Sequence, residues 1–453
     1  MQILRHNAPG FKQSIEKLFR KARPTKEVEH TVRGIIEDLR AQGDKALLAY
    51  TTKFGGPKLT AKTLRETRTP KVDARTARAI ETARKNVHAF AKKSLRKDWQ
   101  MRNAQGGLVG ERFDPYQRIG IYVPGGTAPL VSTAVMTVTI AAAAGVPEIV
   151  VCTPADAKGK INDALLHALK KAGATEIYKV GGAQAIAAMA VGTKSIKGVQ
   201  KIAGPGNAFV VEAKRQLFGE VAIDLLPGPS EVLVIADQSA NPAWAAADLL
   251  AQAEHGKGSG MVLLTDSAAQ LSAIEAEISR QCSKLSRRDH LAGVIEKDAH
   301  LILVSSMAEA VEICNAYAPE HASLMTRNDA SLARKIRSAG ALFLGGYSPV
   351  AVGDFLAGPS HTLPTGGGGK SFPGLMADMF QRRTSWVKLD RESLKKSASV
   401  VQAFSDLEGL DAHGRSVSIR LEADSQSNKP RDKKRGRRRH AELGYNAVMP
   451  LAK

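Results

Sequence analysis

Apolar residues recur at two different spacings along the chain. In the first hundred residues they recur every three or four positions, as in segments 28–50 and 74–94, where Ile35, Ile36 and Leu39 mark one stripe. This spacing predicts amphipathic helices with one face against a core. From Arg118 the apolar residues form short β-rich runs, each followed by glycine or proline and then an alanine-rich segment. That alternation predicts parallel strands joined by crossover helices.

The short runs fall into two groups, which predict two α/β sheets. The first group comprises segments 119–123, 148–153, 176–180 and 200–203, and the second comprises 231–236, 261–264, 301–304 and 341–344. After about residue 375 the pattern is helical again through Leu421, without a long linker. We expect this last part to dock on something larger than itself, such as a second subunit.

Length and composition indicate a globular protein with more than one core. The chain has 453 residues, and 43% of them are hydrophobic. No apolar run has the length needed to cross a bilayer, and the N-terminal segment lacks a secretory pattern, so we expect a cytoplasmic protein. The three cysteines, Cys152, Cys282 and Cys314, are far apart. This argues against a disulfide framework or a thiolate zinc cluster, so a metal would need nitrogen and oxygen ligands.

The formal net charge of +21 would suggest nucleic acid if it were spread over one folded face. Much of it is concentrated near the C-terminus instead. The residues concerned are Lys429, Arg431, Lys433, Lys434, Arg435, Arg437, Arg438 and Arg439. We interpret 425–453 as a flexible basic tail that solubilises the protein or weakly attracts polyanions, because no aromatics are interleaved for base stacking. A dedicated nucleic-acid module is the alternative.

Three of the predicted strands end in glycine-rich turns, at 124–127, 181–184 and 204–207. Glycine at a strand-to-helix turn lets the backbone approach a ligand, and the start of the following helix favours a phosphate. Three such turns suggest a nucleotide. None fits the strict G-x-G-x-x-G spacing of the dinucleotide fold, so tight turns without a ligand are the other interpretation of each.

A helix that ends in polar residues is predicted at the start of the second sheet. Asn241 can cap it, Pro242 can occupy its first position and Gly256 can end it. Gln252 and His255 then lie three residues apart on one face of the last turn and could share a metal ion. The alternative is a polar turn in which His255 merely interacts with the helix dipole.

Two further segments place carboxylates beside histidines. Glu320 and His321 are adjacent after a predicted helix and a proline, and such a pair can supply two proton-transfer groups near one reacting carbon. Asp354 and His361 share a Gly/Pro-rich loop after a strand, where binding groups concentrate. Segment 408–413 carries another such pair, which by itself reads as a solvated turn.

Taken together, these motifs resemble the histidinol dehydrogenase family from about residue 15 to about residue 422. The motifs that carry the resemblance are Gly120–Gly126, Val180–Ala187, Gly204–Val210, Gly228–Glu231, Gln252–Gly256 and Ala318–His321. The resemblance implies oxidation of L-histidinol to L-histidine through L-histidinal, with two NAD, in the last steps of histidine biosynthesis.

The resemblance also assigns the metal and the proton-transfer groups. It implies one zinc ion per subunit, bound by Gln252, His255, Asp354 and His413. His321 would remove the alcohol proton, and Glu320 would activate water against the aldehyde. In the family the metal anchors the imidazole and amine nitrogens of the substrate, which is a positioning role.

The remaining assignments concern the cofactor and the substrate. Tyr122, Gln184 and Asn207 match the positions at which the family contacts NAD. The positions that match its substrate contacts are Ser230, Gln252, His255, His321, Asp354, His361, Glu408 and His413.

The family fold implies an α/β protein with two incomplete Rossmann-like parallel-sheet domains, small helical domains and an intertwined homodimer. In such a dimer Glu408 and His413 come from the partner subunit, and a monomer would be inactive. The expected segments are 1–24, packing with the C-terminal part; 25–121 with 231–370, carrying the metal and catalytic residues; 122–230, binding NAD; 371–424, reaching the partner; and the tail 425–453.

The sequence departs from the family pattern beside the substrate positions. Ser360 precedes His361 where the family commonly has asparagine, and four glycines occupy 366–369. These departures leave open a related zinc dehydrogenase for another small alcohol, such as a sulfonated propanediol. Glu408 argues against that alternative, because a carboxylate would repel a sulfonate. Another alternative is a nucleic-acid-binding protein that uses the basic tail on an inactive enzyme scaffold.

Overall fold

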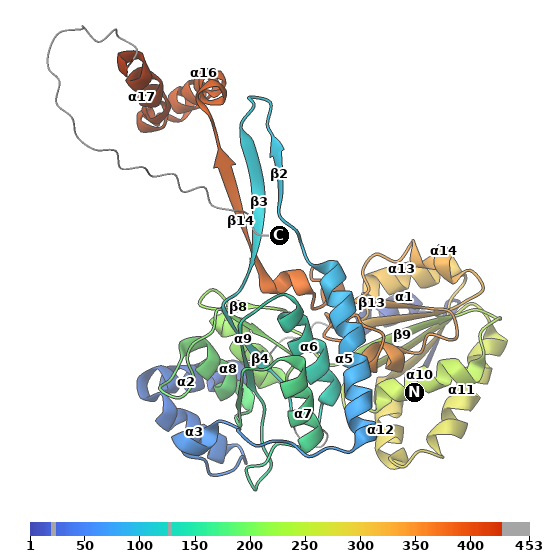
Figure 1. The fold of residues 1–453 in the computed structure, drawn as a ribbon. Helices are drawn as coiled ribbons and strands as arrows, with labels where there is room; N and C mark the ends of the chain where they lie inside the picture. Colours follow the sequence, from blue (N-terminus) through green and yellow to red (C-terminus); the bar gives the residue numbers. More distant parts are fainter. Residues whose placement is uncertain (20–23, 126–128, 428–453) are drawn as a thin grey trace, which may run out of the picture. The chain divides into compact units, whose positions relative to one another are not determined.

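The computed structural model describes residues 1–19, 24–125 and 129–427 (Figure 1). The chain divides into two compact units, the first made of 1–97 and 113–383 and the second of 98–112 and 384 onward. Because the described residues end at 427, most of the expected basic tail, 425–453, lies outside them. No helix in the described ranges has the length and apolarity to cross a membrane.

The first unit contains a five-stranded parallel sheet in the order β6-β5-β4-β7-β8. Its strands are β4 (Arg118–Tyr122), β5 (Glu148–Cys152), β6 (Glu176–Tyr178), β7 (Lys201–Ala203) and β8 (Ala222–Ile223). The chain passes from β4 outward to β5 and β6 and then returns to place β7 on the other side of β4. The strand order therefore reverses between β4 and β7.

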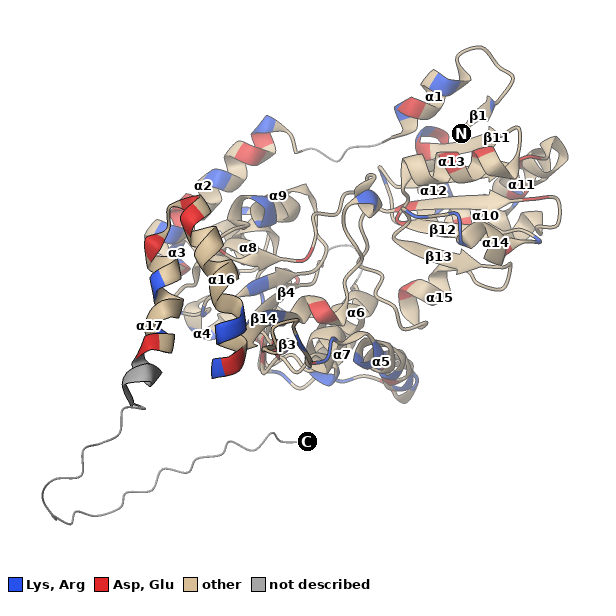
Figure 2. Cartoon of the chain, turned by 90° about the horizontal axis from the view of Figure 1, so that it is seen from above, with Lys and Arg blue, Asp and Glu red and all other residues tan. Residues whose placement is uncertain are grey.

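Helices cover both faces of this sheet, as expected for a parallel sheet whose strands are buried. On one face lie α5 (Ala74–Ser94), α6 (Val131–Ala143) and α7 (Asp163–Ala172). On the other lie α2 (Lys26–Gln42), α3 (Asp44–Lys53), α8 (Gly182–Val191) and α9 (Ala208–Leu217). The short helix α4 (Ala61–Leu64) precedes α5. Charged residues of α2, α3 and α5 stand out in Figure 2.

The first unit also contains a six-stranded parallel sheet in the order β1-β11-β10-β9-β12-β13. Its strands are β1 (Gln2–Arg5), β9 (Glu231–Ala236), β10 (Gly260–Thr265), β11 (Ala299–Leu303), β12 (His321–Met325) and β13 (Ala341–Leu344). All residues of the three central strands β9, β10 and β12 are buried.

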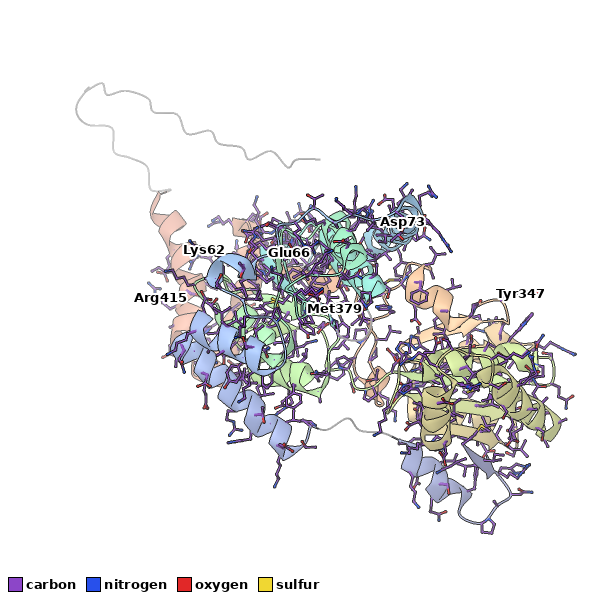
Figure 3. The ribbon with its side chains drawn as sticks, turned by 90° about the horizontal axis from the view of Figure 1, so that it is seen from below. Lys62, Glu66, Asp73, Tyr347, Met379 and Arg415 are labelled. Carbon is purple, nitrogen blue, oxygen red and sulfur yellow. The ribbon has the colours of Figure 1, made fainter. Side chains whose placement is uncertain are left out.

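The six-stranded sheet is likewise covered on both faces. One face carries α10 (Pro242–Ala253), α11 (Ala268–Cys282), α12 (Arg288–Asp298) and Val350 of α15 (Val350–Phe355). The other carries α1 (Phe11–Leu18), α13 (Met307–Tyr317) and α14 (Asp329–Ala333). Tyr347, labelled in Figure 3, is 91% exposed, and its ring lies 5.0 Å from that of Trp244 in α10.

The second unit contains most of an antiparallel hairpin and its neighbouring strand, together with two helices; 113–115 of the hairpin and 381–383 of the neighbouring strand belong to the first unit. The hairpin strands are β2 (Trp99–Arg102) and β3 (Leu108–Pro115), and β14 (Gln381–Lys388) adds a third strand beside β3. Two 3₁₀ turns, Gly368–Lys370 and Ala377–Phe380, precede β14. Helices α16 (Arg391–Glu408) and α17 (Asp411–Ser427) pack together, with Gly409 ending α16 in a left-handed conformation at φ 65°.

The strands expected from the apolar runs all form, and the α/β class with two parallel sheets is confirmed. The expected helix 28–50 is two helices, because Gly43 adopts φ 52° and interrupts the pattern. The sequence pattern did not reveal β1, β2, β3, β8, β12 or β14. The expectation that the chain is helical again after about residue 375 is wrong for Gln381–Lys388, which forms β14; most of its side chains are exposed, so the strand has no buried apolar run that would mark it in the sequence.

The structure distributes the chain between the sheets differently from the expected segments. Residues 25–121 were expected with the metal and catalytic residues, but the apolar stripe of α2 packs with α8 and α9 on the five-stranded sheet, and β4 is a strand of that sheet. Within 1–24, β1 extends the six-stranded sheet beside β11. Residues 98–112 join the second unit.

Candidate active site

The expected catalytic pair lies at the amino-terminal edge of the six-stranded sheet. His321 is the first residue of β12, and Glu320 precedes it. On the neighbouring strand β9, Ser230 and Glu231 occupy the corresponding place, and His321 is in register with Val232. Glu320 and His321 are both buried, with 6% and 3% of their surface exposed.

A left-handed residue delivers the pair to this edge. Helix α13 ends at Tyr317, and Ala318 then adopts φ 53°, the sole positive φ of a non-glycine residue in the described ranges. Ala318 is fully buried, and its N–H donates to the carbonyl of Cys314 at 2.8 Å. Such a conformation disfavours any residue with a Cβ, so the surrounding fold must hold it. Pro319 follows and leads directly into the catalytic pair.

Hydrogen bonds fix the orientation of both side chains. The Ser230 hydroxyl and the Glu231 backbone N–H, the latter at 2.9 Å, donate to Oε2 of Glu320. Nδ1 of His321 lies 3.1 Å from the carbonyl oxygen of Glu231. A carbonyl can only accept, so Nδ1 carries the proton and Nε2 of the neutral ring keeps its lone pair. Oδ1 of Asp354 lies 3.7 Å from that Nε2.

Burial sets the ionisation of these groups. It raises the pKa of Glu320 to about 7, although the bonds from Ser230 and Glu231 act in the opposite direction. Burial also lowers the pKa of His321, which favours the neutral ring, and raises the pKa of Asp354. Perturbed carboxylates and imidazoles gathered at one place are typical of catalytic sites.

Helix α10 positions two of the expected zinc ligands. Asn241 caps the helix by accepting a hydrogen bond from Ala243 at 2.9 Å, and Pro242 begins it, as the sequence predicted. Gln252 lies in the last turn as predicted, but the helix ends at Ala253, so the prediction that His255 shares that turn is wrong: His255 follows the helix end, just before Gly256 at φ 94°. The C-terminal end of α10 therefore reaches the same edge of the sheet as the catalytic pair.

Gln252 is available for a ligand. Its Oε1 lies 3.5 Å from the Ser230 hydroxyl, and its buried Nε2 has no hydrogen-bond partner. His255 is exposed at the surface, yet desolvation by the surrounding protein lowers its pKa, which favours the neutral imidazole that metals bind. Asp354 lies in α15 rather than in the expected loop.

Zinc takes nitrogen and oxygen donors of these kinds, so the three residues fit the expected metal. In the part of the chain that the structure describes, no three His, Cys, Asp or Glu side chains are gathered closely enough to hold a metal by themselves. The expected set differs from such a group because it includes the amide of Gln252 and His413 of the second unit.

His361 connects the two sheets of the first unit. Its Nδ1 lies 3.0 Å from the carbonyl of Asp354, and its Nε2 lies 3.2 Å from the hydroxyl of Thr133 in α6. Burial lowers its pKa to about 4, so the ring is neutral at physiological pH. The neighbouring Ser360 hydroxyl donates to the carbonyl of Met136, also in α6, at 3.3 Å. The segment after α15 is thus tied to the five-stranded sheet.

Two of the expected NAD residues, Tyr122 and Asn207, follow β4 and β7, where the strand order reverses, and the third, Gln184, lies in α8 after β6. Tyr122 ends β4, and its hydroxyl accepts a hydrogen bond from the N–H of Gly182 at 3.0 Å. Gln184 is buried with no partner for its Oε1. Asn207 caps α9 by accepting from Phe209 and Val210. A reversal of this kind is where open α/β sheets bind ligands. Residues 126–127 of the first glycine-rich turn lie outside the described residues.

Glu408 and His413 belong to the second unit. Glu408 is the last residue of α16, and His413 lies in the first turn of α17. Both side chains are exposed. The structure therefore brings together Ser230, Gln252, Glu320, His321 and Asp354 through hydrogen bonds and close charged contacts, whereas Glu408 and His413 lie on two helices of the second unit.

Three residues near the site were not expected from the sequence. Thr133 contacts His361, as described above. The carboxylate of Glu231 accepts a hydrogen bond from the N–H of Gly366 at 3.1 Å and so anchors the glycine-rich loop. Asp248, one turn before Gln252 in α10, lies 3.4 Å from the Ser323 hydroxyl, and burial raises its pKa to about 6. Asp248 could have been identified from the sequence, because it is a charged residue within an otherwise largely apolar helix.

Comparisons with known proteins agree with this geometry. The histidinol dehydrogenase family model matches residues 18–421. A histidinol dehydrogenase from Heliobacterium mobile is 41% identical over 394 residues, covering 86% of this chain and 92% of the relative. One from Bacillus subtilis (strain 168) is 41% identical over 401 residues, covering 87% and 94%.

A solved structure is similar over nearly the whole chain. The crystal structure of histidinol dehydrogenase from Elizabethkingia anophelis superimposes with a TM-score of 0.89 at 35% identity, and the match covers 94% of this chain and 99% of that one. Sequence and fold thus agree over the segments that carry both the catalytic pair and the glycine-rich turns. This chain belongs to the histidinol dehydrogenase family.

Proposed function

We propose that this protein oxidises L-histidinol to L-histidine through L-histidinal, in two NAD-dependent steps. Family membership supports the reaction, and one observation assigns its proton transfers to particular atoms. The Glu231 carbonyl holds the Nδ1 proton of His321 and leaves Nε2 as a base, beside a buried carboxylate, Glu320, whose pKa is raised to about 7. Two proton acceptors with different environments suit an alcohol oxidation followed by attack of water.

The first-unit residues Gln252, His255 and Asp354 would hold one zinc ion, with His413 supplied by a second copy of the chain. When bound, the zinc would anchor the imidazole and amine nitrogens of the substrate and so orient its carbinol carbon. Ser230 and His361 would line the same substrate site, and the Glu408 carboxylate of the second copy would suit the N–H groups of histidinol. A homodimer is therefore part of the proposal.

Tyr122, Gln184 and Asn207 would hold NAD, which accepts one hydride in each oxidation. The unpartnered Oε1 of buried Gln184 supports this assignment, because a buried polar atom without a partner is costly in the absence of a ligand. The position of Tyr122 and Asn207 at the strand-order reversal supports it as well, and Gly182 at the start of the Gln184 helix donates to the Tyr122 hydroxyl.

The chain's own residues account for the proton transfers. Nε2 of His321 takes the proton of the alcohol in the first step, when the carbon is oxidised to the aldehyde. Glu320 then takes a proton from water as the water oxygen bonds to the aldehyde carbon. In the second oxidation the carbon-bound hydrogen of the hydrate would leave as a hydride to a second NAD, and a hydroxyl proton of the hydrate would be released, which gives the carboxylate. Burial of both side chains limits bulk water around the reactive aldehyde.

The alternative function, a dehydrogenase that acts on a sulfonated propanediol, receives no support from the comparisons. The hypothesis of a nucleic-acid-binding protein rests on tail residues outside the described part of the chain. A cytoplasmic location remains a prediction from the sequence.

Reaction stoichiometry tests the proposal. We expect two NADH per histidinol consumed by the purified protein, and loss of this activity after treatment with a chelator and its return with Zn²⁺. One NADH per histidinol, or turnover of a sulfonated propanediol in preference to histidinol, would overturn the function. Full activity in metal-free protein would overturn the zinc assignment.

A further inference from the structure

A fully buried ion pair lies beneath the third glycine-rich turn. Lys214 of α9 and Asp224, just after β8, form a close salt bridge, and neither side chain has any exposed surface. Lys214 is among the largest fully buried side chains of the described residues. Neither residue was singled out from the sequence, and the mechanism above does not use either.

This pair holds both backbone polar groups of a single glycine. Oδ2 of Asp224 accepts a hydrogen bond from the N–H of Gly204 at 2.7 Å. Nζ of Lys214 donates to the carbonyl oxygen of Gly204 at 3.0 Å. The two charges, opposite in sign, therefore act on opposite ends of one residue and fix the orientation of both of its peptide planes.

No other residue can occupy the position of Gly204 without strain. Gly204 adopts φ 113°, and a Cβ there would lie 2.1 Å from the carbonyl oxygen of Tyr122. The glycine thus packs directly against the end of β4. Pro205, Gly206 and Asn207 follow, and Asn207 begins α9. The ion pair, the turn and Tyr122 form one rigid group at the reversal of strand order.

Stability alone does not explain such a pair. Removing two charges from water costs about as much as their attraction returns, and apolar replacements of similar volume are often at least as stable. An apolar pair would, however, leave the N–H and carbonyl of Gly204 without partners. The feature that only the charged pair supplies is the orientation of this glycine.

We propose that Lys214 and Asp224 are a positioning pair for NAD, which holds the Gly204–Asn207 turn in the conformation that places Asn207 and Tyr122 against the cofactor. The inference rests on the proposed function. Neither residue contacts the cofactor in this proposal, because both lie behind the turn with no exposed surface. Their effect passes through Gly204.

The test measures NADH binding directly, by fluorescence titration or calorimetry of the zinc-loaded protein, alongside steady-state kinetics and thermal unfolding. The variants are Lys214→Met, Asp224→Asn and the double variant Lys214→Met/Asp224→Leu. We expect each to weaken NADH binding and raise the KM for NAD by about tenfold to hundredfold, the range for small misplacement of a binding group. The KM for histidinol and the zinc content should stay near those of the wild type.

The double variant separates positioning from stability. It removes both buried charges, so its thermal stability should recover relative to Lys214→Met, which leaves Asp224 unpaired. Recovered stability with weak NADH binding supports the proposal. Recovered stability with wild-type NADH affinity overturns it, and the double variant decides the question if the single variants do not fold.

A matched control is available in the same sheet. Arg118 and Glu176 form an ion pair at the amino-terminal edge, where Nη1 of Arg118 lies 2.7 Å from the Glu176 carboxylate. Glu176→Gln should lower stability and leave NADH binding unchanged, whereas equal weakening in this variant would overturn the specific role of Lys214 and Asp224. A wild-type protein that binds no NADH would overturn the proposed function itself.

Discussion

At the residue scale, the site depends on a backbone atom as much as on side chains. The carbonyl of Glu231 selects the tautomer of His321, and the N–H of the same residue binds the Glu320 carboxylate. One peptide segment at the start of β9 thus orients both proposed proton acceptors. Substitution of the Glu231 side chain would leave these two bonds in place, because both come from the main chain.

We predict that His255→Asn strips the metal and abolishes oxidation. The amide of asparagine is shorter and is a poorer zinc ligand than imidazole, and loss of a ligand should exceed the roughly 10–100-fold cost of losing an outer partner. Metal analysis and turnover measure the effect. His290→Asn is the control, because His290 is exposed on α12 near the same turn. A His255→Asn protein with full zinc and full turnover would refute the ligand assignment.

We predict that Glu320→Gln slows the second oxidation more than the first. Glutamine can still accept from Ser230 and Glu231 but cannot take a proton from water, so the water-requiring step should slow by about 10²-fold or more. Stopped-flow traces of NADH formation resolve the two phases. Equal slowing of both phases would count against the assigned role of Glu320.

Residue types and motifs revealed part of this site from the sequence. Glu320 and His321 were indicated by their adjacency after a proline, and Asn241 and Pro242 correctly marked the start of α10. The resemblance, rather than residue spacing, joined Asp354 to Gln252 and His255. Thr133 could not be predicted as a neighbour of His361, because a contact across 228 positions in the chain leaves no local pattern.

At the element scale, the expected cofactor residues and the expected catalytic residues lie at opposite edges of their respective sheets. The expected NAD residues follow the rule for open α/β sheets, because each comes after the carboxyl end of a strand, β4, β6 or β7. The proposed catalytic pair lies instead at the amino-terminal end of β12, beside the start of β9 and the end of α10. Sequence reasoning missed β12, and with it this edge, because the strand begins soon after Ala318, whose left-handed conformation is not marked by any turn signature in the sequence.

Acid should destabilise the five-stranded sheet through Glu176. The Arg118 guanidinium holds the pKa of Glu176 at about 2, below its ordinary value of 4.5. The unfolded chain therefore binds the proton more readily, and the stabilisation, present above about pH 4.5, is lost as the pH falls toward about 2. We expect the midpoint of thermal unfolding to fall less steeply below pH 5 in Glu176→Gln than in the wild type. Parallel curves for the two proteins would contradict this.

At the scale of the whole molecule, the sequence predicted the α/β class and two parallel sheets but not how the chain is shared between them. The segment 25–121 was expected beside the metal residues, because chain order gives no information on which sheet an amphipathic helix will cover. The apolar stripe of α2 fits either sheet in composition, and only its packing with α8 and α9 decides the matter.

We predict that two inactive variants restore activity when they are mixed. If His413 is supplied by the partner, a dimer of one His255→Asn chain and one His413→Ala chain contains one complete site. Random reassociation after mild dissociation should then return about a quarter of wild-type turnover. No recovery in dimers that demonstrably exchange chains would show that each site is completed within one chain.

We predict that deletion of residues 428–453 removes polyanion affinity and leaves turnover nearly intact. The deleted segment carries the run of lysines and arginines but none of the assigned site residues. Retention on a heparin column at increasing salt, with turnover measured in parallel, provides the comparison. Loss of turnover together with heparin binding would give the tail a part in the enzyme reaction.

Because His321 is the first residue of β12, the register of β12 against β9 determines whether its imidazole can act as the proposed proton acceptor. Its partner across the ladder is Val232, and successive strand residues face opposite sides. Sliding β12 by a single position along β9 would turn the imidazole away from Glu231 while keeping a compact, hydrophobic interior. Recovered turnover after denaturation would therefore report that two adjacent strands had found their native alignment, which spectroscopic measures of helix content or compaction would not detect.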